Sequence, residues 1–263
     1  MKNILSLAAF ALLAACTAPQ PPTSDAARDL APTGKLRAAI NLGNGVLAQK
    51  DAASGELRGV SVDLARELAR RLGVPLELVP FDAAGKVTAA VQSNAWDIAF
   101  VANDPARAKE ISFTPPYVII EGAYVVPESS PLQTNEDVDR AGVRIAVSNR
   151  SAYDLYLSRE LKQATLVRAP SPPASLEMFI KDKLEAAAGV KQPIVDFAKR
   201  TPGYRVIPGR FMVIEQAMGA PQGREVGARY LREFIEDVKA SGFVAASLAR
   251  SGQKDAAVAP PAK

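Results

Sequence analysis

Apolar and polar positions follow two alternating patterns along most of the chain. Short apolar runs bounded by Gly or Pro, at residues 35–43 and 74–81, predict buried strands. Between them, residues 60–73 place leucine at every fourth position and end on glycine, which predicts an amphipathic helix. A further helix pattern at 83–95 precedes a strand pattern at 96–102. Strands that alternate with helices indicate an α/β domain with a mainly parallel sheet.

A second stretch of the chain repeats this alternation after a polar, proline-containing break at residues 126–139. Strand and helix patterns follow each other over residues 142–200, and extended segments at 204–219 lead into helices at 223–252. Two α/β units in one chain place the default ligand site at their junction. Strand ends and helix N-termini should line that junction, where helix dipoles and free backbone N–H groups favour anions.

The two ends of the chain lack these patterns. Residues 1–15 carry an apolar run that is too short to span a membrane, which predicts a signal peptide. The run ends in Leu-Ala-Ala-Cys, which resembles a bacterial lipobox and predicts lipid attachment at Cys16, and hence a membrane-anchored lipoprotein in the periplasm. Residues 16–34 and 253–263 are rich in small residues and proline, and we expect a flexible tether and a disordered tail there.

Composition narrows the possible chemistry. The formal net charge is +4, and basic and acidic residues are mixed along the chain, so nucleic acid is not an expected partner. Histidine is absent from the sequence, which removes the Ser-His-Asp triad and nearly every zinc site. Cys16 is the only cysteine, so no disulfide is expected. We therefore expect no metal, no cofactor and no catalytic centre.

Four segments together resemble one protein family. Arg107 stands six residues before Phe113, with Pro116 and Tyr117 beyond, and this resembles the arginine and FS-x-PY signature of family 3 extracellular solute-binding proteins. These receptors usually feed amino-acid ABC transporters. Three further segments are similar to the family in the same order: residues 59–81, 96–102 and 142–157. The resemblance covers about residues 35 to 250.

The resemblance implies a periplasmic-binding-protein type II fold, in which two α/β lobes joined by two crossovers close on a ligand in the cleft between them. Lobe 1 would cover residues 35–125 and 208–252, and lobe 2 residues 126–207. The implied function is that of a monomeric receptor that delivers a small carboxylate-bearing ligand, an amino acid or a related organic acid, to a membrane ABC permease.

Three residues match the family's carboxylate site or its surroundings. Arg107 matches the arginine that forks onto the ligand's carboxylate, although a solvated helical turn is the alternative for "ARAKE". Ser151 matches a residue at a helix N-terminus that donates to the same carboxylate, and it is also a plain N-cap candidate. Arg150 replaces the family's usual glycine, and either stays solvated or takes a second acidic group.

Val190 occupies the place of the family's aspartate that binds the α-ammonium group of an amino acid, if the alignment has no one-residue slip. Burying that ammonium group without a counter-charge is unfavourable. Either Glu121 or another acid substitutes, or the ligand has no ammonium group there. Lys191 and Gln192 follow directly and favour an acidic or carbonyl-bearing ligand.

The remaining candidates each have two interpretations. Asn41 and Asn44 follow the first strand, where they either bind ligand or build a turn. Tyr117 either supplies an aromatic surface for the ligand or is buried for structural reasons. Glu121 and Gln216 lie near the expected crossovers, as hinge or ligand contacts. Trp96, the only tryptophan, is assigned to packing.

Two alternative functions stay open. Cyclohexadienyl dehydratases are similar to this family, and an enzyme of that type would need a carboxyl group such as Glu121 or Glu185 as general acid. A lipoprotein that senses a ligand and passes its closed form to another protein is the third hypothesis.

Overall fold

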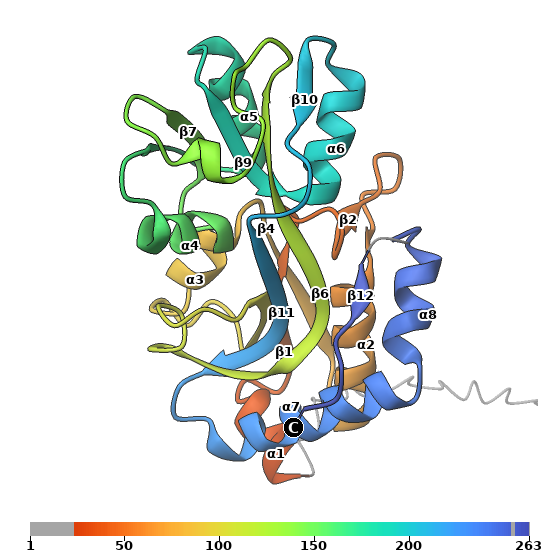
Figure 1. Cartoon of the computed structure of the whole chain (residues 1–263). Coiled ribbons are helices and arrows are strands. Elements are labelled where there is room, and N and C mark those ends of the chain that lie inside the picture. Colours follow the sequence, from red (N-terminus) through yellow and green to blue (C-terminus); the bar gives the residue numbers. More distant parts are fainter. Residues whose placement is uncertain (1–23, 254–255, 263) are drawn as a thin grey trace, which may run out of the picture.

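The computed structural model describes residues 24–253 and 256–262, and within them ten strands form one mixed sheet (Figure 1). Its strands are β1 (Leu36–Asn41), β4 (Leu76–Phe81), β5 (Ile98–Ala102), β6 (Ile111–Pro127), β7 (Arg144–Ser148), β8 (Thr165–Ala169), β9 (Ala186–Val190), β10 (Tyr204–Val206), β11 (Met212–Pro221) and β12 (Ala257–Val258). A separate antiparallel pair consists of β2 (Gln49–Lys50) and β3 (Leu57–Arg58). The helices are α1 (Asp25–Leu30), α2 (Val60–Leu72), α3 (Ala84–Ala89), α4 (Ala152–Glu160), α5 (Pro172–Lys181), α6 (Lys191–Arg200), α7 (Glu225–Ala240) and α8 (Phe243–Arg250), with a 3₁₀ turn η1 (Glu136–Val138).

The strand order divides the sheet into two lobes that share β6. Along the sheet the order is β4-β1-β5-β11-β6-β9-β7-β8, with β10 and β12 also paired to β6. In lobe 1, β1 is parallel to β4 and β5, whereas β11 is antiparallel to β5 and β6. In lobe 2, β7 is parallel to β8 and β9. The α/β architecture expected from the alternating patterns is confirmed.

Helix α2 shows how local sequence produces these elements. Leu64, Leu68 and Leu72 are buried on the face that packs against the lobe 1 sheet. Each buried leucine contributes about 1.5–3 kcal/mol relative to an exposed one. Gly73 then takes a left-handed conformation with φ 67° and donates its backbone N–H to the carbonyl of Ala69, which ends the helix as predicted.

The passage between the lobes lies at Gly122 on β6. This strand pairs with β11 up to Gly122, and with β9 and β10 from Gly122 to Pro127. The first crossover is therefore a few residues earlier than the expected boundary at residue 125. The chain returns over residues 207–211, where the backbone N–H of Phe211 donates to the carbonyl of Gly122. A Cβ atom on Gly122 would lie 2.8 Å from Met212 Cγ and 2.9 Å from Phe211 Cζ, so the two crossovers are in close contact.

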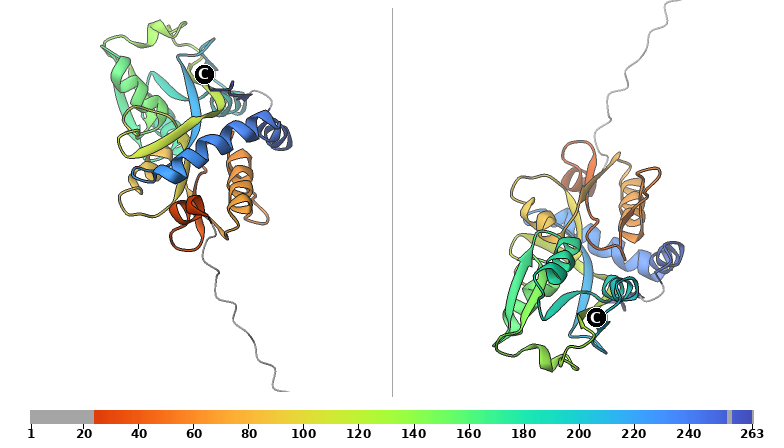
Figure 2. Two further views of the ribbon diagram at one scale, coloured as in Figure 1. Left: turned by 90° about the horizontal axis from the view of Figure 1, so that it is seen from below. Right: turned by 90° about the horizontal axis from the view of Figure 1, so that it is seen from above.

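The expected tether is wrong for its last part. Residues 25–30 form α1, which lies against α7 at the base of lobe 1 (Figures 1 and 2). Ser24 caps this helix, and Leu30 is fully buried and in contact with the Cα of Gly227, where a Cβ would lie 2.5 Å from Leu30 Cδ2. A single amphipathic turn is too short to stand out in the sequence, and its order comes from tertiary packing. The signal peptide, Cys16 and the first part of the tether lie outside the described residues.

The expected disordered tail is also wrong over residues 256–262. Strand β12 pairs with β6, and the backbone N–H of Ala259 donates to the carbonyl of Tyr117. The ammonium group of Lys239 donates to the carbonyls of Pro116 and Pro260 and fixes the segment to lobe 1. We call residues 256–262 the C-terminal strap.

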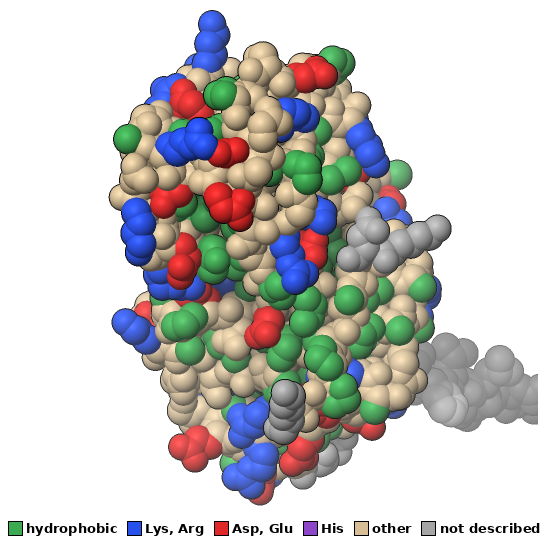
Figure 3. All heavy atoms as spheres, in the orientation of Figure 1, with side chains coloured by type: hydrophobic (Ala, Val, Ile, Leu, Met, Phe, Trp, Pro, Cys, Tyr) green, Lys and Arg blue, Asp and Glu red, His purple; other side chains and the backbone are tan. Residues whose placement is uncertain are grey.

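Trp96 packs in the core of lobe 1, as expected. Its side chain is fully buried, and its indole N–H donates to the carbonyl of Val87 at 2.9 Å. Among the described residues, no helix is long and apolar enough to cross a membrane. On the face seen in Figure 3, basic and acidic side chains are intermixed rather than grouped by sign.

Candidate functional site

A small space between the lobes is lined by residues from the ends of four elements. Strands β1, β5 and β7 reach it through Asn41, Ala102 and Ser148, and helix α4 begins there after Ser151. Because Arg107 also lines this space, we call it the Arg107 pocket. Its volume is about 40 Å³, far below the roughly 300–1,000 Å³ of typical ligand pockets. A ligand of ordinary size enters only if the lobes move apart.

Arg107 is buried rather than solvated. It lies in the turn after β5 and is only 4% exposed. Its Nη1 donates to the carbonyl of Ala102 at 2.8 Å, and its Nη2 donates to the carbonyl of Arg150 at 2.9 Å. Its Nε has no hydrogen-bond partner within the described part of the chain. The surface-turn interpretation of this arginine is therefore wrong.

Burial lowers the pKa of Arg107 to about 10, with the nearby Asp104 carboxylate acting in the opposite direction and Arg150 adding to the decrease. The guanidinium group still carries its charge at neutral pH. A buried cation with an unused N–H donor is a strong partner for an anion, because charge-assisted hydrogen bonds are about twice as strong as neutral ones.

Ser151 caps helix α4. Its Oγ accepts a hydrogen bond from the backbone N–H of Asp154 at 3.1 Å, and the side chain is buried at the edge of the Arg107 pocket. The N-cap role is thus present in the structure. The hydroxyl hydrogen can still donate, and the first N–H groups of the helix have no partner within the helix itself. Both features favour an anion at this position.

The side chain of Arg150 does not line the Arg107 pocket, which favours the solvated alternative. Arg150 is exposed, and its backbone adopts a left-handed conformation with φ 56°. The residue acts through its main chain, since its N–H donates to Asp154 Oδ2 at 2.7 Å and its carbonyl accepts from Arg107. The left-handed backbone turns the carbonyl towards Arg107 and the side chain towards solvent.

Asn41 and Asn44 line the Arg107 pocket and also build the turn after β1. The Oδ1 atoms accept from the backbone N–H groups of Gly43 at 3.1 Å and Val46 at 3.3 Å, respectively. The side-chain amide nitrogens make no hydrogen bond within the described residues, so the turn role leaves donors available to a ligand.

Tyr117 lies outside the pocket, which favours its structural interpretation over the ligand one. It is fully buried in the core of lobe 1, where its hydroxyl lies 3.1 Å from Ser61 Oγ and its ring meets Phe100 edge to face. Burial raises the pKa of the Tyr117 hydroxyl well above its usual range. The signature residue is a packing residue in this chain.

Two pocket residues with polar side chains were not singled out from the sequence. Ser148 ends β7 and is almost fully buried in the pocket wall. Tyr153 lies in the first turn of α4, and burial raises the pKa of its hydroxyl to about 12. The position of Ser148 at the carboxyl end of a parallel strand is a signal that could have identified it. Gln216 on β11, 4% exposed, also lines the pocket, which favours the ligand-contact interpretation.

Glu121, Lys191 and Arg210 form a separate ionic group, which we call the hinge triad. Glu121 Oε2 lies 2.7 Å from Lys191 Nζ, and its Oε1 lies 2.7 Å from Arg210 Nη1. The residues come from β6, the start of α6 and the return crossover, so the triad bridges the three segments at the hinge. Both cations lower the pKa of the Glu121 carboxyl group, through hydrogen bonds that outweigh its desolvation.

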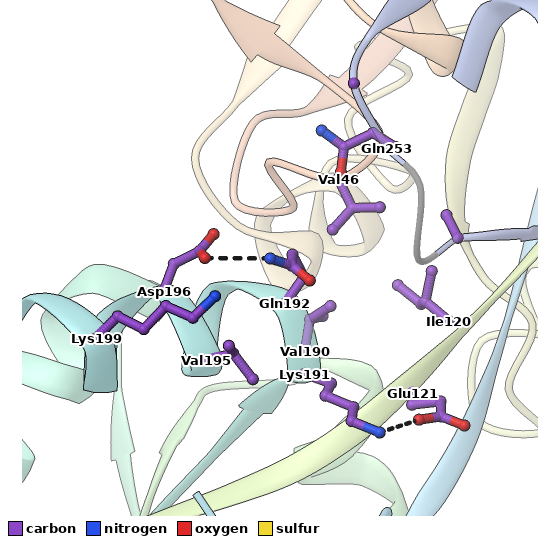
Figure 4. Close-up of a pocket in the computed structure, with 12 residues that line it drawn as sticks. Val46, Ile120, Glu121, Val190, Lys191, Gln192, Val195, Asp196, Lys199 and Gln253 are labelled. Atoms are coloured by element: carbon purple, nitrogen blue, oxygen red, sulfur yellow. Dashed lines mark hydrogen bonds and ion pairs between the residues drawn. The ribbon is translucent and has the colours of Figure 1, made fainter. Parts of the chain in front are cut away.

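Glu121 and Lys191 of the hinge triad line a larger cavity of about 720 Å³, the hinge chamber (Figure 4). Gln192, whose amide donates to Asp196 Oδ1 at 3.1 Å, lines this chamber rather than the Arg107 pocket. Val46 and Gln253 contribute from lobe 1. Val190 lines both spaces, so the Arg107 pocket and the hinge chamber are neighbours.

The two lobes also contact each other on the side of the Arg107 pocket that faces away from the hinge chamber. A Cβ on Gly85 in α3 would lie 2.5 Å from the carbonyl oxygen of Asn149 and 2.9 Å from Arg150 Cβ, so backbone meets backbone there. An ion pair of 3.0 Å joins Asp104 of lobe 1 to Arg159 of lobe 2. The structure therefore shows the lobes drawn together around Arg107.

A two-lobed sheet with an anion-favouring site at the lobe junction is typical of solute-binding proteins. The chain belongs to the bacterial extracellular solute-binding proteins, family 3, whose model matches residues 48–253. Over 197 residues it is 26% identical to a Haemophilus influenzae protein described as a probable amino-acid ABC transporter-binding protein, covering 72% of this chain and 74% of that protein.

Solved structures show the same fold. A mutant of ArgBP from T. maritima superposes with a TM-score of 0.74 at 19% identity, covering 87% of this chain and 100% of the other. An amino acid ABC transporter substrate-binding protein from Streptococcus pneumoniae, bound to L-arginine, gives 0.72 at 17% identity and covers 86% and 97%. An ancestral amino acid-binding protein, a precursor of cyclohexadienyl dehydratase, gives 0.70 at 18% identity and covers 85% and 97%. The two-lobed fold is confirmed.

Proposed function

We propose that the chain is a lipid-anchored periplasmic receptor that binds a small carboxylate-bearing ligand at Arg107 and delivers it to an ABC permease. The carrying observation is the buried guanidinium group of Arg107, whose Nε has no partner among the described residues. Family membership supports the transport role. The names of the relatives support an amino acid or a related acid as the ligand.

The contacts around Arg107 suggest how closure and binding are coupled. When the lobes separate, Arg107 of lobe 1 loses the carbonyl of Arg150 in lobe 2. A carboxylate entering the cleft replaces this carbonyl as acceptor and adds a bond to Nε. On closure, the N-terminus of α4 with Ser151 approaches the same carboxylate from lobe 2. Ligand and lobe closure therefore stabilise each other.

An enzymatic role on the same scaffold is less well supported. Glu121 is paired with two cations, and Glu185 is paired with Arg144 at 2.9 Å at the start of β9. These partners lower the pKa of both carboxyl groups, which leaves both ionised near neutral pH and unable to act as general acids. Neither residue lines the Arg107 pocket.

The proposed anchor at Cys16 is tested separately from the binding role. Full-length protein produced in a Gram-negative bacterium should incorporate labelled palmitate and stay with the membrane fraction. Cys16→Ser should remove the label and release the protein. Equal labelling of both proteins would contradict lipidation at this residue.

The binding role is tested by the thermal stability of a chain lacking residues 1–16, measured against amino acids, 2-oxo acids and dicarboxylates. A ligand present at 100 times its dissociation constant should add about 2.7 kcal/mol to the free energy of unfolding. Arg107→Ala should abolish this gain. The matched control is Arg140→Ala, which alters an exposed arginine in lobe 2. An undiminished gain in Arg107→Ala would refute Arg107 as the carboxylate site.

A further inference from the structure

The Arg107 pocket has no acidic wall. Among the described residues that line it, Arg107 is the only charged side chain, and the other polar ones are the neutral groups of Asn, Ser, Tyr and Gln. The pocket therefore offers a positive charge and neutral hydrogen-bonding groups to its ligand. It offers no carboxylate to a cation.

Two acids that lie next to pocket residues in the sequence are held by other partners. Asp104 accepts from the backbone N–H of Ala106 at 2.8 Å and pairs with Arg159. Asp154 is 2% exposed and pairs with Arg168 at 3.0 Å. Neither residue lines the pocket, and moving either buried carboxylate towards a ligand would break its ion pair.

The two acids of the hinge chamber lie on the other side of Val190. Glu121 is held by the hinge triad. Asp196 accepts from the Gln192 amide and lines the hinge chamber but not the Arg107 pocket. When the carboxylate of a ligand binds at Arg107, the substituent on the neighbouring carbon of that ligand would therefore lie in a space without a negative charge.

An α-ammonium group fits this space poorly for two reasons. It would be withdrawn from water without a counter-charge, and it would lie near the guanidinium group of Arg107, which burial already disfavours. A carbonyl or hydroxyl oxygen has the opposite preference, because the amide nitrogens of Asn41 and Asn44 can donate to it.

We infer that the ligand of the Arg107 pocket is an organic acid with a carbonyl or hydroxyl oxygen, and not an ammonium group, on the carbon next to its carboxylate. This inference rests on the proposed function and names its ligand class: 2-oxo and 2-hydroxy acids.

The test is calorimetric titration of wild-type protein with matched sets of acids. Each set contains a 2-oxo acid, the 2-hydroxy acid and the L-amino acid with one carbon skeleton, such as 2-oxoglutarate, 2-hydroxyglutarate and L-glutamate, or phenylpyruvate, phenyllactate and L-phenylalanine. In the set that binds, the oxo or hydroxy acid should bind about tenfold or more tightly than the amino acid. An amino acid that binds as tightly as its oxo and hydroxy analogues overturns the inference and leaves the proposed function standing. Failure of every acid to bind overturns both.

Two variants test the cause. Val190→Asp and Gln216→Glu each introduce a carboxylate into the pocket wall, the second with almost no change in shape. Each should shift the ratio of amino-acid to oxo-acid affinity about tenfold towards the amino acid. Val190→Asn is the uncharged control and should leave the ratio unchanged. A ratio that stays the same in both charged variants would show that the missing acid does not set the preference.

Discussion

Arg107 and Glu121 are both charged groups near the lobe junction, and the structure gives them opposite surroundings. Arg107 is 4% exposed, hydrogen bonds only to main-chain carbonyls and keeps one donor without a partner in the described residues. Glu121 has a side chain that is 30% exposed and pairs with two cations. Both residues are candidates for ligand binding when only the sequence is known.

The two groups differ in whether the protein itself supplies their counter-charge, and this difference matters more than the sign of the charge. The carboxylate of Glu121 has its counter-charges within the protein, so its contribution is to the hinge, and exposed pairs of this kind are weak. The guanidinium group of Arg107 is desolvated and has no paired carboxylate among residues 24–253 and 256–262, a costly arrangement that is typical of a group whose partner is a ligand.

The largest effect is expected at Arg107 for a change that preserves the charge. Arg107→Lys keeps a cation but loses the planar fork, so the affinity for the acid should fall about 10- to 100-fold. Calorimetric titration measures this loss. Lys191→Arg, the reverse exchange at the hinge triad, should change affinity by less than about threefold. Similar losses in the two variants would remove the contrast between the pocket and the triad.

An intermediate effect is expected at the hinge itself. Gly122→Ala forces a methyl group against Met212 and Phe211, and should lower the free energy of unfolding by about 1–3 kcal/mol. Urea denaturation provides the measurement. The control is Gly45→Ala, since a Cβ there meets nothing within 4 Å, and this variant should lose no stability. Equal stability of the two variants would mean that the side chains around Gly122 can accommodate a methyl group without cost.

The smallest effect is expected for Glu121→Gln, which removes the charge of the hinge triad. The free energy of unfolding should fall by about 1 kcal/mol or less at neutral pH, with less effect in high salt, because both cations are more than a third exposed. Ligand affinity should be unchanged. A tenfold loss of affinity would instead place Glu121 among the ligand contacts.

The difference in the free energy of unfolding between wild type and Glu121→Gln should depend on pH with a definite sign. The pKa of Glu121 is lower in the folded protein than its ordinary value of 4.5, so its stabilising contribution is fully present above that value. The contribution disappears as the pH falls through the lower folded value. The stabilities of wild type and Glu121→Gln should therefore converge in acid, as urea denaturation at a series of pH values would show. A difference that grows in acid would contradict the cause assigned to the shift.

Much of the fold was predictable because local patterns of apolar residues and glycine determine its helices and strands. Leucine spacing and Gly73 predicted helix α2, and the apolar runs predicted β1, β4 and β5. The C-terminal strap was not predictable, since its composition is that of a disordered segment. The strap is ordered by its pairing with β6 and by the hydrogen bond from Lys239 to the carbonyl of Pro260. Both partners lie outside the strap segment in the sequence.

The site was predictable in its position but not in its side-chain directions. The motif around Arg107 and the capping pattern at Ser151 led to the right junction. Tyr117 belongs to the same motif but lies on β6, whereas Arg107 lies in the turn before that strand, and the tyrosine side chain packs in the core of lobe 1. Arg150 depends on a left-handed backbone that no spacing rule reveals. Such directions follow from tertiary geometry alone.

The position of Trp96 gives the molecule a built-in optical probe of one lobe. Its indole ring is the only one in the sequence and is sealed in the lobe 1 core, bonded to Val87 in the segment that also carries α3. Tryptophan emission therefore reports the unfolding of lobe 1 and does not report the unfolding of lobe 2. Following the closing motion by fluorescence requires a second chromophore, placed in lobe 2.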